Sequence, residues 1–328
     1  KSYYFTEKFG ISEGTLATDL NQLEPWFHKY QLLLIRRQGL GIFIDGTEIA
    51  RRQALTSFIC QQVNQHYSIG TLQKNGFLSN QHFIEEIDGE VMAQVNRILD
   101  DCQKQLSMQL SDNGYLHLLV YTSLCVQRMQ KGKFIKDSKQ SYTEMSIQQE
   151  YDVSEYIMKK LREFFHLYIS IDESKYMAVF ISGQRIWSSD KKDLTDIRNL
   201  DIHQITISII KKVSNILQIN FLRDDRLLTE LSGHIQPTIA RLRAGIPVEN
   251  PLLKEFQESY PSVYNACEEG LSLLCPLLRI KKVPASEIGF ITLYFTMAIE
   301  RIEKEIKRLS VIIVCPTGIG SSRLLTES

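Results

Sequence analysis

Apolar residues recur at three- and four-residue spacing over most of the chain, from about residue 56 to residue 308. The segments LHLLVYTSLCVQRM, YIMKKLREFF and IGFITLYFTMAIERI show the spacing clearly. Because this spacing places apolar side chains along one face of a helix, it predicts a mainly α-helical protein over this region.

The first 50 residues follow a different pattern. Residues 2–9 can form a short helix that Gly10 ends, and Ser12 can cap a second helix with three leucines on one face. The segment LLLIRRQGLGIFIDG then has apolar runs on both sides of a basic tip, which predicts a β-hairpin. Helix, turn, helix and hairpin is the order of a winged helix-turn-helix, whose second helix enters the DNA major groove.

The candidate DNA-contacting residues lie on the second predicted helix and on the hairpin: Ser12, Thr15, Thr18, Asn21, Gln22, Arg36 and Arg37. Thr, Asn and Gln can hydrogen-bond to base edges, and arginine can bind phosphate. A small α/β unit that binds no DNA remains an alternative, because acids nearly balance the bases in this region. The first helix of a complete module is missing, so we expect the chain to begin inside a longer protein.

Two stretches of the helical region share landmarks. Tyr121 stands seven residues before Arg128, just as His234 stands seven residues before Arg241. Further along, the segments ESKYMAVF and EIGFITLY each place a glutamate seven residues before an aromatic residue, which is Phe180 in one and Tyr294 in the other. The separation between the two landmarks differs by one residue between the stretches. This agreement predicts two related helical domains of roughly 100 residues each.

The tandem repeat resembles the paired regulation domains (PRDs) of transcription regulators controlled by the sugar phosphotransferase system (PTS). GLGIFIDGTEIARRQAL resembles the end of their DNA-binding region, and NPLLKEFQESYP is similar to their second regulation domain. VIIVCPTGIGSSRLL resembles the start of an α/β EIIB-like domain. The order is similar to the mannitol-operon-activator group of this family.

The resemblance implies five parts in the chain. They are a winged helix-turn-helix at 1–55, a linker helix at 56–84, a first PRD at 85–192, a second PRD at 193–308 and the start of an EIIB-like domain at 309–328. Both PRDs are expected to be all-α bundles.

The resemblance also implies two phosphorylatable histidines in each PRD, at the positions that Tyr121, Phe180, His234 and Tyr294 occupy here. Only His234 keeps the imidazole, and phenol with a pKa of about 10 is a poor acceptor. Arg241 lies two helical turns after His234, so it is a candidate partner for the phosphate.

His117 stands one helical turn before Tyr121 and is a candidate substitute acceptor. Its place between two leucines is also typical of a packing residue. His234 itself can likewise be an interface or core histidine.

Cys315 follows the apolar run Val311–Val314, which predicts a buried strand. A phosphate loop is expected after it, formed by Thr317, Gly318, Ile319, Gly320, Ser321 and Ser322. Loop amides and a helix N-terminus favour the thiolate and can hold a phosphoryl group on sulfur. The distance to Arg323 is too long for a tyrosine phosphatase, and the loop lacks the GK[ST] ending of a nucleotide P-loop. A buried cysteine before a glycine turn remains an alternative.

Composition adds little to this picture. Lys plus Arg and Asp plus Glu both number 38, so the zero formal charge neither favours nor excludes a nucleic-acid partner. The six cysteines form no CxxC pair, so we expect no metal site, no cofactor and a reducing compartment. No apolar run approaches the roughly 18 residues of a membrane span, which favours a cytoplasmic protein without membrane insertion.

These observations predict a DNA-binding transcriptional regulator rather than an enzyme, and more specifically an activator of a sugar-utilisation operon. The expected partners are promoter or operator DNA, HPr and the PTS EIIA and EIIB proteins as phosphoryl donors, and a second copy in a homodimer. The resemblance implies that phosphorylation in the second PRD favours activity. Two alternatives stay open, an EIIB-type phosphocarrier that uses Cys315 and an RNA-binding antiterminator.

Overall fold

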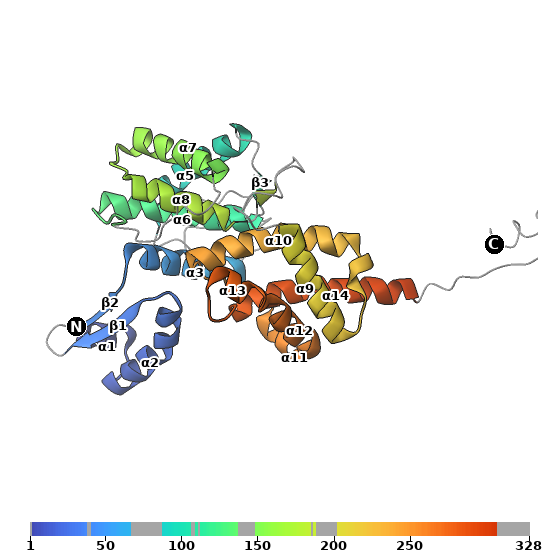
Figure 1. Cartoon of the computed structure of the whole chain (residues 1–328). Coiled ribbons are helices and arrows are strands. Elements are labelled where there is room, and N and C mark those ends of the chain that lie inside the picture. The colour runs from blue at the N-terminus through green and yellow to red at the C-terminus, as the bar shows by residue number, and fades with distance from the viewer. Residues whose placement is uncertain are drawn as a thin grey trace, which may run out of the picture.

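The computed structural model describes residues 2–37, 41–66, 87–105, 109–110, 112–136, 148–184, 186–187 and 202–306. Helices dominate these residues, which confirms the prediction of a mainly α-helical protein. Three parts are visible in Figure 1: an N-terminal unit (residues 2–45), a first repeat (residues 87–187) and a second repeat (residues 202–306). The predicted EIIB-like segment at 309–328 lies outside the described residues.

Local signals set the helices of the N-terminal unit. Helix α1 (Ser2–Phe9) ends at Gly10, whose φ of 62° lies in the left-handed region that glycine adopts without strain. Helix α2 (Glu13–Lys29) begins after Ser12, whose hydroxyl accepts a hydrogen bond from the Thr15 amide at 3.0 Å. Both features agree with the pattern in the sequence.

The hairpin follows the two helices. Strands β1 (Leu33–Arg37) and β2 (Gly41–Asp45) pair in antiparallel fashion with Ile35 opposite Phe43. A hydrogen bond of 2.7 Å from Arg36 to Glu24 ties the hairpin to α2. The N-terminal unit therefore has its helices and hairpin in the predicted order.

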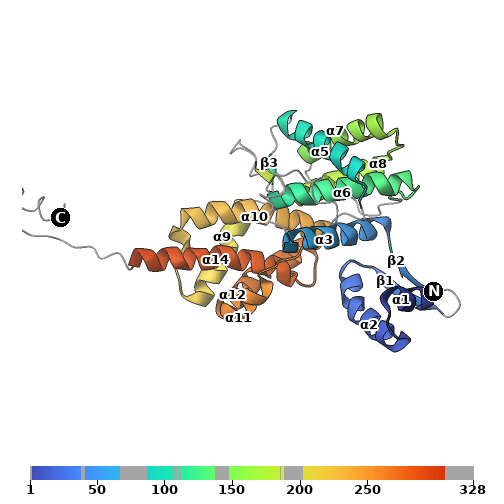
Figure 2. The ribbon, with the colours of Figure 1, turned by 180° about the vertical axis from the view of Figure 1, so that it is seen from behind.

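Helix α3 (Glu48–His66) connects the N-terminal unit to the rest of the protein and runs across the domain boundary expected at residue 55. Ala50 and Ala54 face the small core of the N-terminal unit, whereas Ile59 and Val63 belong to the core of the first repeat. Both views show α3 lying along the first repeat beside α6 (Figures 1 and 2). The helix is thus shared by the two parts.

Within its described residues, the first repeat consists of four helices and a two-stranded antiparallel sheet: α5 (Gly89–Gln105), α6 (Asp112–Gln130), α7 (Gln148–Phe165), α8 (Ile171–Ser182), β3 (Gln109–Leu110) and β4 (Ile186–Trp187). The second repeat consists of α9 (Ile202–Leu217), the 3₁₀ turn η2 (Phe221–Arg223), α10 (Asp225–Ala244), α11 (Leu253–Ser259), α12 (Pro261–Leu271), α13 (Leu274–Leu278) and α14 (Ala285–Ile306). Each repeat surrounds its own apolar core. Among the described helices, none has the length and apolar character needed to cross a bilayer.

The end of α10 joins the two repeats. Ala244 and Ile246 lie within the second repeat in the sequence, but their side chains pack in the core of the first repeat. Arg241 donates from Nη1 to the carbonyl of Gly183, just after α8, at 2.9 Å. A Cβ at Gly183 would lie 2.9 Å from Cγ of Arg241, so this close approach requires glycine.

The second repeat also touches the N-terminal unit. Glu249, in the segment between α10 and α11, forms an ion pair with Lys29 at the end of α2. The Tyr30 hydroxyl lies 3.3 Å from the Glu249 carboxylate and 2.5 Å from Oγ of Ser57 on α3. The N-terminal unit, α3 and the second repeat therefore meet at one place.

Candidate functional site

Tyr121 on α6 and Phe180 on α8 lie face to face in the first repeat. Their ring centroids are 4.0 Å apart, the ring planes differ by 15°, and both side chains are buried. Burial raises the pKa of the Tyr121 phenol well above its ordinary value, so the hydroxyl keeps its proton. The two positions that the sequence aligned with histidines are thus in contact, and they form an aromatic stack without an imidazole.

His234 on α10 and Tyr294 on α14 form the matching pair in the second repeat. Their ring centroids are 5.3 Å apart, and the ring of Phe290 lies 5.7 Å from the imidazole. His234 is partly exposed, unlike the buried Tyr121 at the matched position. A neutral imidazole is a good nucleophile near neutral pH. Of the four positions, only this one carries an imidazole; the residue is partly exposed, although its Nε2 atom is buried.

Arg241 lies two turns after His234 on α10 and is buried. Its Nε donates to Glu287 at 2.7 Å and its Nη2 donates to the same carboxylate at 2.8 Å. Nη2 also donates to the hydroxyl of Thr238 at 3.0 Å, and Nη1 is bound by the Gly183 carbonyl. The guanidinium is therefore engaged within the protein, and its role as phosphate partner of His234 stays a prediction.

His117 lies on α6 and is partly exposed. Burial, and to a smaller extent the positive charge of Arg241, lower the pKa of its imidazole to about 4. The ring is consequently neutral at pH 7. Its role as a substitute phosphate acceptor stays a prediction.

The candidate DNA-contacting side chains are all exposed on the N-terminal unit: Ser12, Thr15, Thr18, Asn21, Gln22, Arg36 and Arg37. Local contacts already engage several of them, because Ser12 caps α2 and the Thr18 hydroxyl donates to the carbonyl of Gly14 at 3.1 Å. Arg36 is held by Glu24. DNA binding by this surface stays a prediction.

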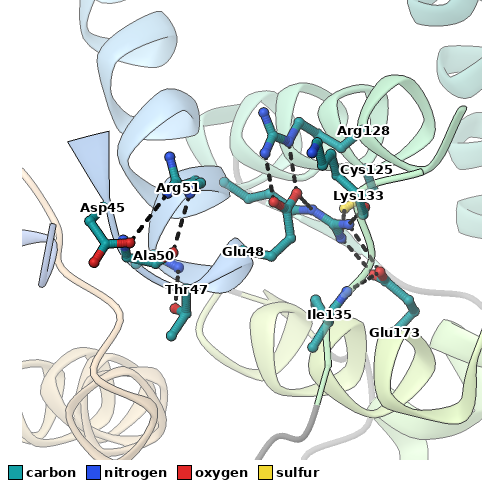
Figure 3. Close-up of polar contacts among 12 residues, drawn as sticks. Asp45, Thr47, Glu48, Ala50, Arg51, Cys125, Arg128, Lys133, Ile135 and Glu173 are labelled. Atoms are coloured by element: carbon teal, nitrogen blue, oxygen red, sulfur yellow. Dashed lines mark hydrogen bonds and ion pairs between the residues drawn. The ribbon is translucent and has the colours of Figure 1, made fainter. Parts of the chain in front are cut away.

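The structure shows a buried ion-pair network between α3 and the first repeat that was not predicted from the sequence. Arg52 is fully buried and donates from both Nη atoms to Glu173 at 2.5 and 2.9 Å. Glu48, one turn earlier on α3, accepts from Arg52 at 2.9 Å and from Arg128 at 2.7 and 2.6 Å. Figure 3 shows the Glu48 carboxylate beside Arg128, with Glu173 on the other side of the network.

The charges of this network outweigh the effect of burial. Burial alone would raise the pKa of Glu48, but its hydrogen bonds and charge interactions with Arg128 and Arg52 lower it below the usual value. The four-residue spacing of Glu48 and Arg52 is typical of a helical ion pair and is the signal in the sequence for half of the network. The pairing with Glu173 has no comparable local signal.

The proposed phosphate loop lies outside the described residues. This applies to Cys315 and to the loop residues that follow it. Their phosphoryl chemistry stays a prediction.

The structure thus contains two helical repeats, and in each repeat the two matched positions lie in contact on neighbouring helices. This arrangement is the one expected of a protein with tandem regulation domains. The PRD domain family matches residues 96–184 and 207–306, which together exceed half of the chain. The chain therefore belongs to the PRD domain family, and the predicted resemblance is confirmed.

The curated relatives include two regulators from Bacillus subtilis (strain 168). The chain is 26% identical to the "Probable licABCH operon regulator" over 98% of its own length and 48% of the relative. It is 25% identical to the "Transcriptional regulator ManR" over 96% of its own length and 47% of the relative. "Protein GlcT" of Staphylococcus saprophyticus is 24% identical over 72% of this chain and 79% of the relative. The chain thus spans about half the length of the first two relatives.

Proposed function

We propose that this chain is the DNA-binding and regulatory part of a transcriptional activator of a sugar-utilisation operon, controlled by PTS phosphorylation of His234. The observation that carries the proposal is the contrast between the repeats. The first has a buried aromatic stack at its two matched positions, whereas the second keeps a histidine that is partly exposed as a residue and whose Nε2 atom is buried beside Tyr294. Membership of the PRD family and similarity to two named regulators support a regulatory role.

Helix α10 connects His234 physically to the surroundings of the N-terminal unit. A phosphoryl group adds close to two negative charges beside Tyr294 and Phe290, where the present contacts are between rings. The same helix ends against the first repeat through Arg241, and the segment after it contacts Lys29 through Glu249. A change in the packing of α10 would therefore act on both neighbours.

We propose that the exposed polar residues of α2 contact base edges of promoter DNA and that Arg36 and Arg37 contact phosphates. A homodimer would present two such units to two half-sites. HPr and the PTS EIIA and EIIB proteins are the proposed phosphoryl donors. Cys315 is a second proposed acceptor, which would report sugar transport.

Phosphotransfer tests the role of His234. Purified chain is incubated with phosphoenolpyruvate, EI and HPr, and the acid-labile label is compared among wild type, His234→Ala and His203→Ala. His203 is an exposed histidine on α9 and serves as the matched control. We expect the label to fall strongly in His234→Ala alone. Label that survives this substitution unchanged would remove His234 from the mechanism.

Gel-shift competition tests the nucleic-acid partner. The chain is offered the promoter duplex upstream of its own gene and an RNA transcript of the adjoining leader, with Asn21→Ala and the control Asn215→Ala. We expect preference for the duplex and a loss of about tenfold or more for Asn21→Ala, because one good base contact is worth about 1–3 kcal/mol. Preference for the transcript would instead indicate an antiterminator.

A further inference from the structure

The two repeats use the same acidic position in different ways. In the second repeat, Glu287 pairs with Arg241 of the same repeat. The spacing of the landmarks makes Glu173 and Arg128 the matched residues of the first repeat. Glu173 instead binds Arg52, which belongs to α3.

The second half of the matched pair is also bound by α3. Arg128 donates to Glu48 through two nitrogens, at 2.7 and 2.6 Å. In the second repeat the matched glutamate and arginine bind each other. In the first repeat they do not: Glu173 binds Arg52 and Arg128 binds Glu48, both on α3.

The surroundings show that Arg52 takes the place in the first repeat that Arg241 has in the second. Arg241 contacts Thr238, three residues before it, and Arg52 contacts Cys125, three residues before Arg128, at 3.4 Å. Each guanidinium also donates to a backbone carbonyl, at Gly183 in one repeat and at Lys133 in the other. The site around Glu173 is thus built for one guanidinium, and a second guanidinium, that of Arg128, belongs to the same network through Glu48.

We propose that Arg52 and Arg128 compete for Glu173, so that the first repeat has a second arrangement in which Arg128 binds Glu173 and the first turns of α3 are released, while Ile59 and Val63 stay in the core. In that arrangement the first repeat has the internal ion pair seen in the second, and Glu48 and Arg52 move to solvent with these turns. The exchange matters because a buried carboxylate left without a partner strongly destabilises a protein. Arg128 replaces the lost partner, so this release leaves no unpaired charge at Glu173.

The exposure of the side chains fits this exchange. The side chain of Arg52 is 0% exposed, whereas that of Arg128 is 25% exposed at the rim of the network. The side chain of Arg128 can therefore rotate toward Glu173 without first leaving a fully buried position. Since α3 follows the hairpin after a break of only two residues, release of its first turns would free the N-terminal unit from the first repeat.

Thermal unfolding of the chain distinguishes exchange from a fixed network. With exchange, Arg52→Gln and Arg128→Gln each lower the Tm by less than about 3 °C, because the other arginine still holds Glu173. The double variant then loses more than about twice the sum of the two losses. With a fixed network, Arg52→Gln alone causes the large fall in Tm, and Arg128→Gln adds only its own smaller fall. Such an additive result would overturn the proposal.

A matched control uses Arg51, the half-buried neighbour of Arg52 on α3. The Arg51→Gln/Arg128→Gln pair should be additive, because Arg51 contacts Gly46 and Asp45 rather than the network. If the Arg52→Gln/Arg128→Gln variant does not fold, adding Glu173→Gln removes the unpaired charge and should restore folding. A triple variant that stays unfolded would count against the proposal.

Amide hydrogen exchange measures the release of the first turns of α3 directly. In Arg52→Gln we expect amides of these turns to exchange at least about tenfold faster than in wild type, while α8, which carries Glu173, keeps its protection. Wild-type exchange in these turns, or equal loss of protection in α8, would refute the proposal. Neither measurement uses DNA or phosphorylation, so the result is independent of the proposed function.

Discussion

His117 should make the stability of the protein depend on pH. Its pKa in the folded protein is about 4, against an ordinary value of 6.5. Between these two values the unfolded chain binds a proton that the folded protein does not bind. The free energy of unfolding therefore falls as the pH falls from about 6.5 to about 4.

The size of the effect follows from the two pKa values. A difference of one in pKa corresponds to about 1.4 kcal/mol, which gives an upper limit of about 3 kcal/mol for His117. The residue is partly exposed, so water screens the interaction, and about 1–2 kcal/mol is the more realistic expectation.

The assay is urea unfolding of wild type and His117→Gln at pH 7.5 and pH 5. Other titrating groups are present in both proteins, so their contributions cancel in the comparison. The variant should lose less stability than wild type on acidification, whereas His203→Gln, at an exposed position on α9, should follow wild type. An equal loss in wild type and His117→Gln would refute the assignment of an imidazole that stays neutral in the folded protein.

Two further predictions concern the contacts between the parts. Gly183→Ala should destabilise the protein by about 1–3 kcal/mol in urea unfolding, because its Cβ would press on the bound side chain of Arg241. Gly233→Ala on α10 is the control; its Cβ meets nothing within 4 Å, so a gain of about 0.5–1 kcal/mol is expected. Glu249→Gln should speed amide exchange at the end of α2 with little change in the unfolding midpoint, since the ion pair with Lys29 is partly exposed and screened by water. Unchanged exchange there would show that Glu249 does not hold the N-terminal unit.

Sequence reasoning worked where a few neighbouring residues decide the structure. The end of α1 at Gly10 and the start of α2 after Ser12 depend on one glycine conformation and one capping hydroxyl. Matched spacing in two repeats picked out four equivalent positions, and the structure adds that they lie in contact as the pairs Tyr121–Phe180 and His234–Tyr294, which the spacing did not predict.

Contacts between distant segments were beyond this reasoning. Arg52 and Glu173 are 121 residues apart, and nothing near either residue indicates the other. The spacing placed Arg241 on the side of His234 but could not show that Glu287 binds its guanidinium. Both outcomes depend on how helices pack, which periodicity along one helix does not determine.

The packing of Ala244 and Ile246 into the first repeat sets limits on how the protein can be divided. A fragment cut between the repeats would expose the apolar surface that Ile246 covers and would leave the Gly183 carbonyl without Arg241. Chimaeras that exchange one repeat between relatives should therefore carry the end of α10 together with the first repeat. For protein engineering, the useful cut points do not coincide with the ends of the repeats.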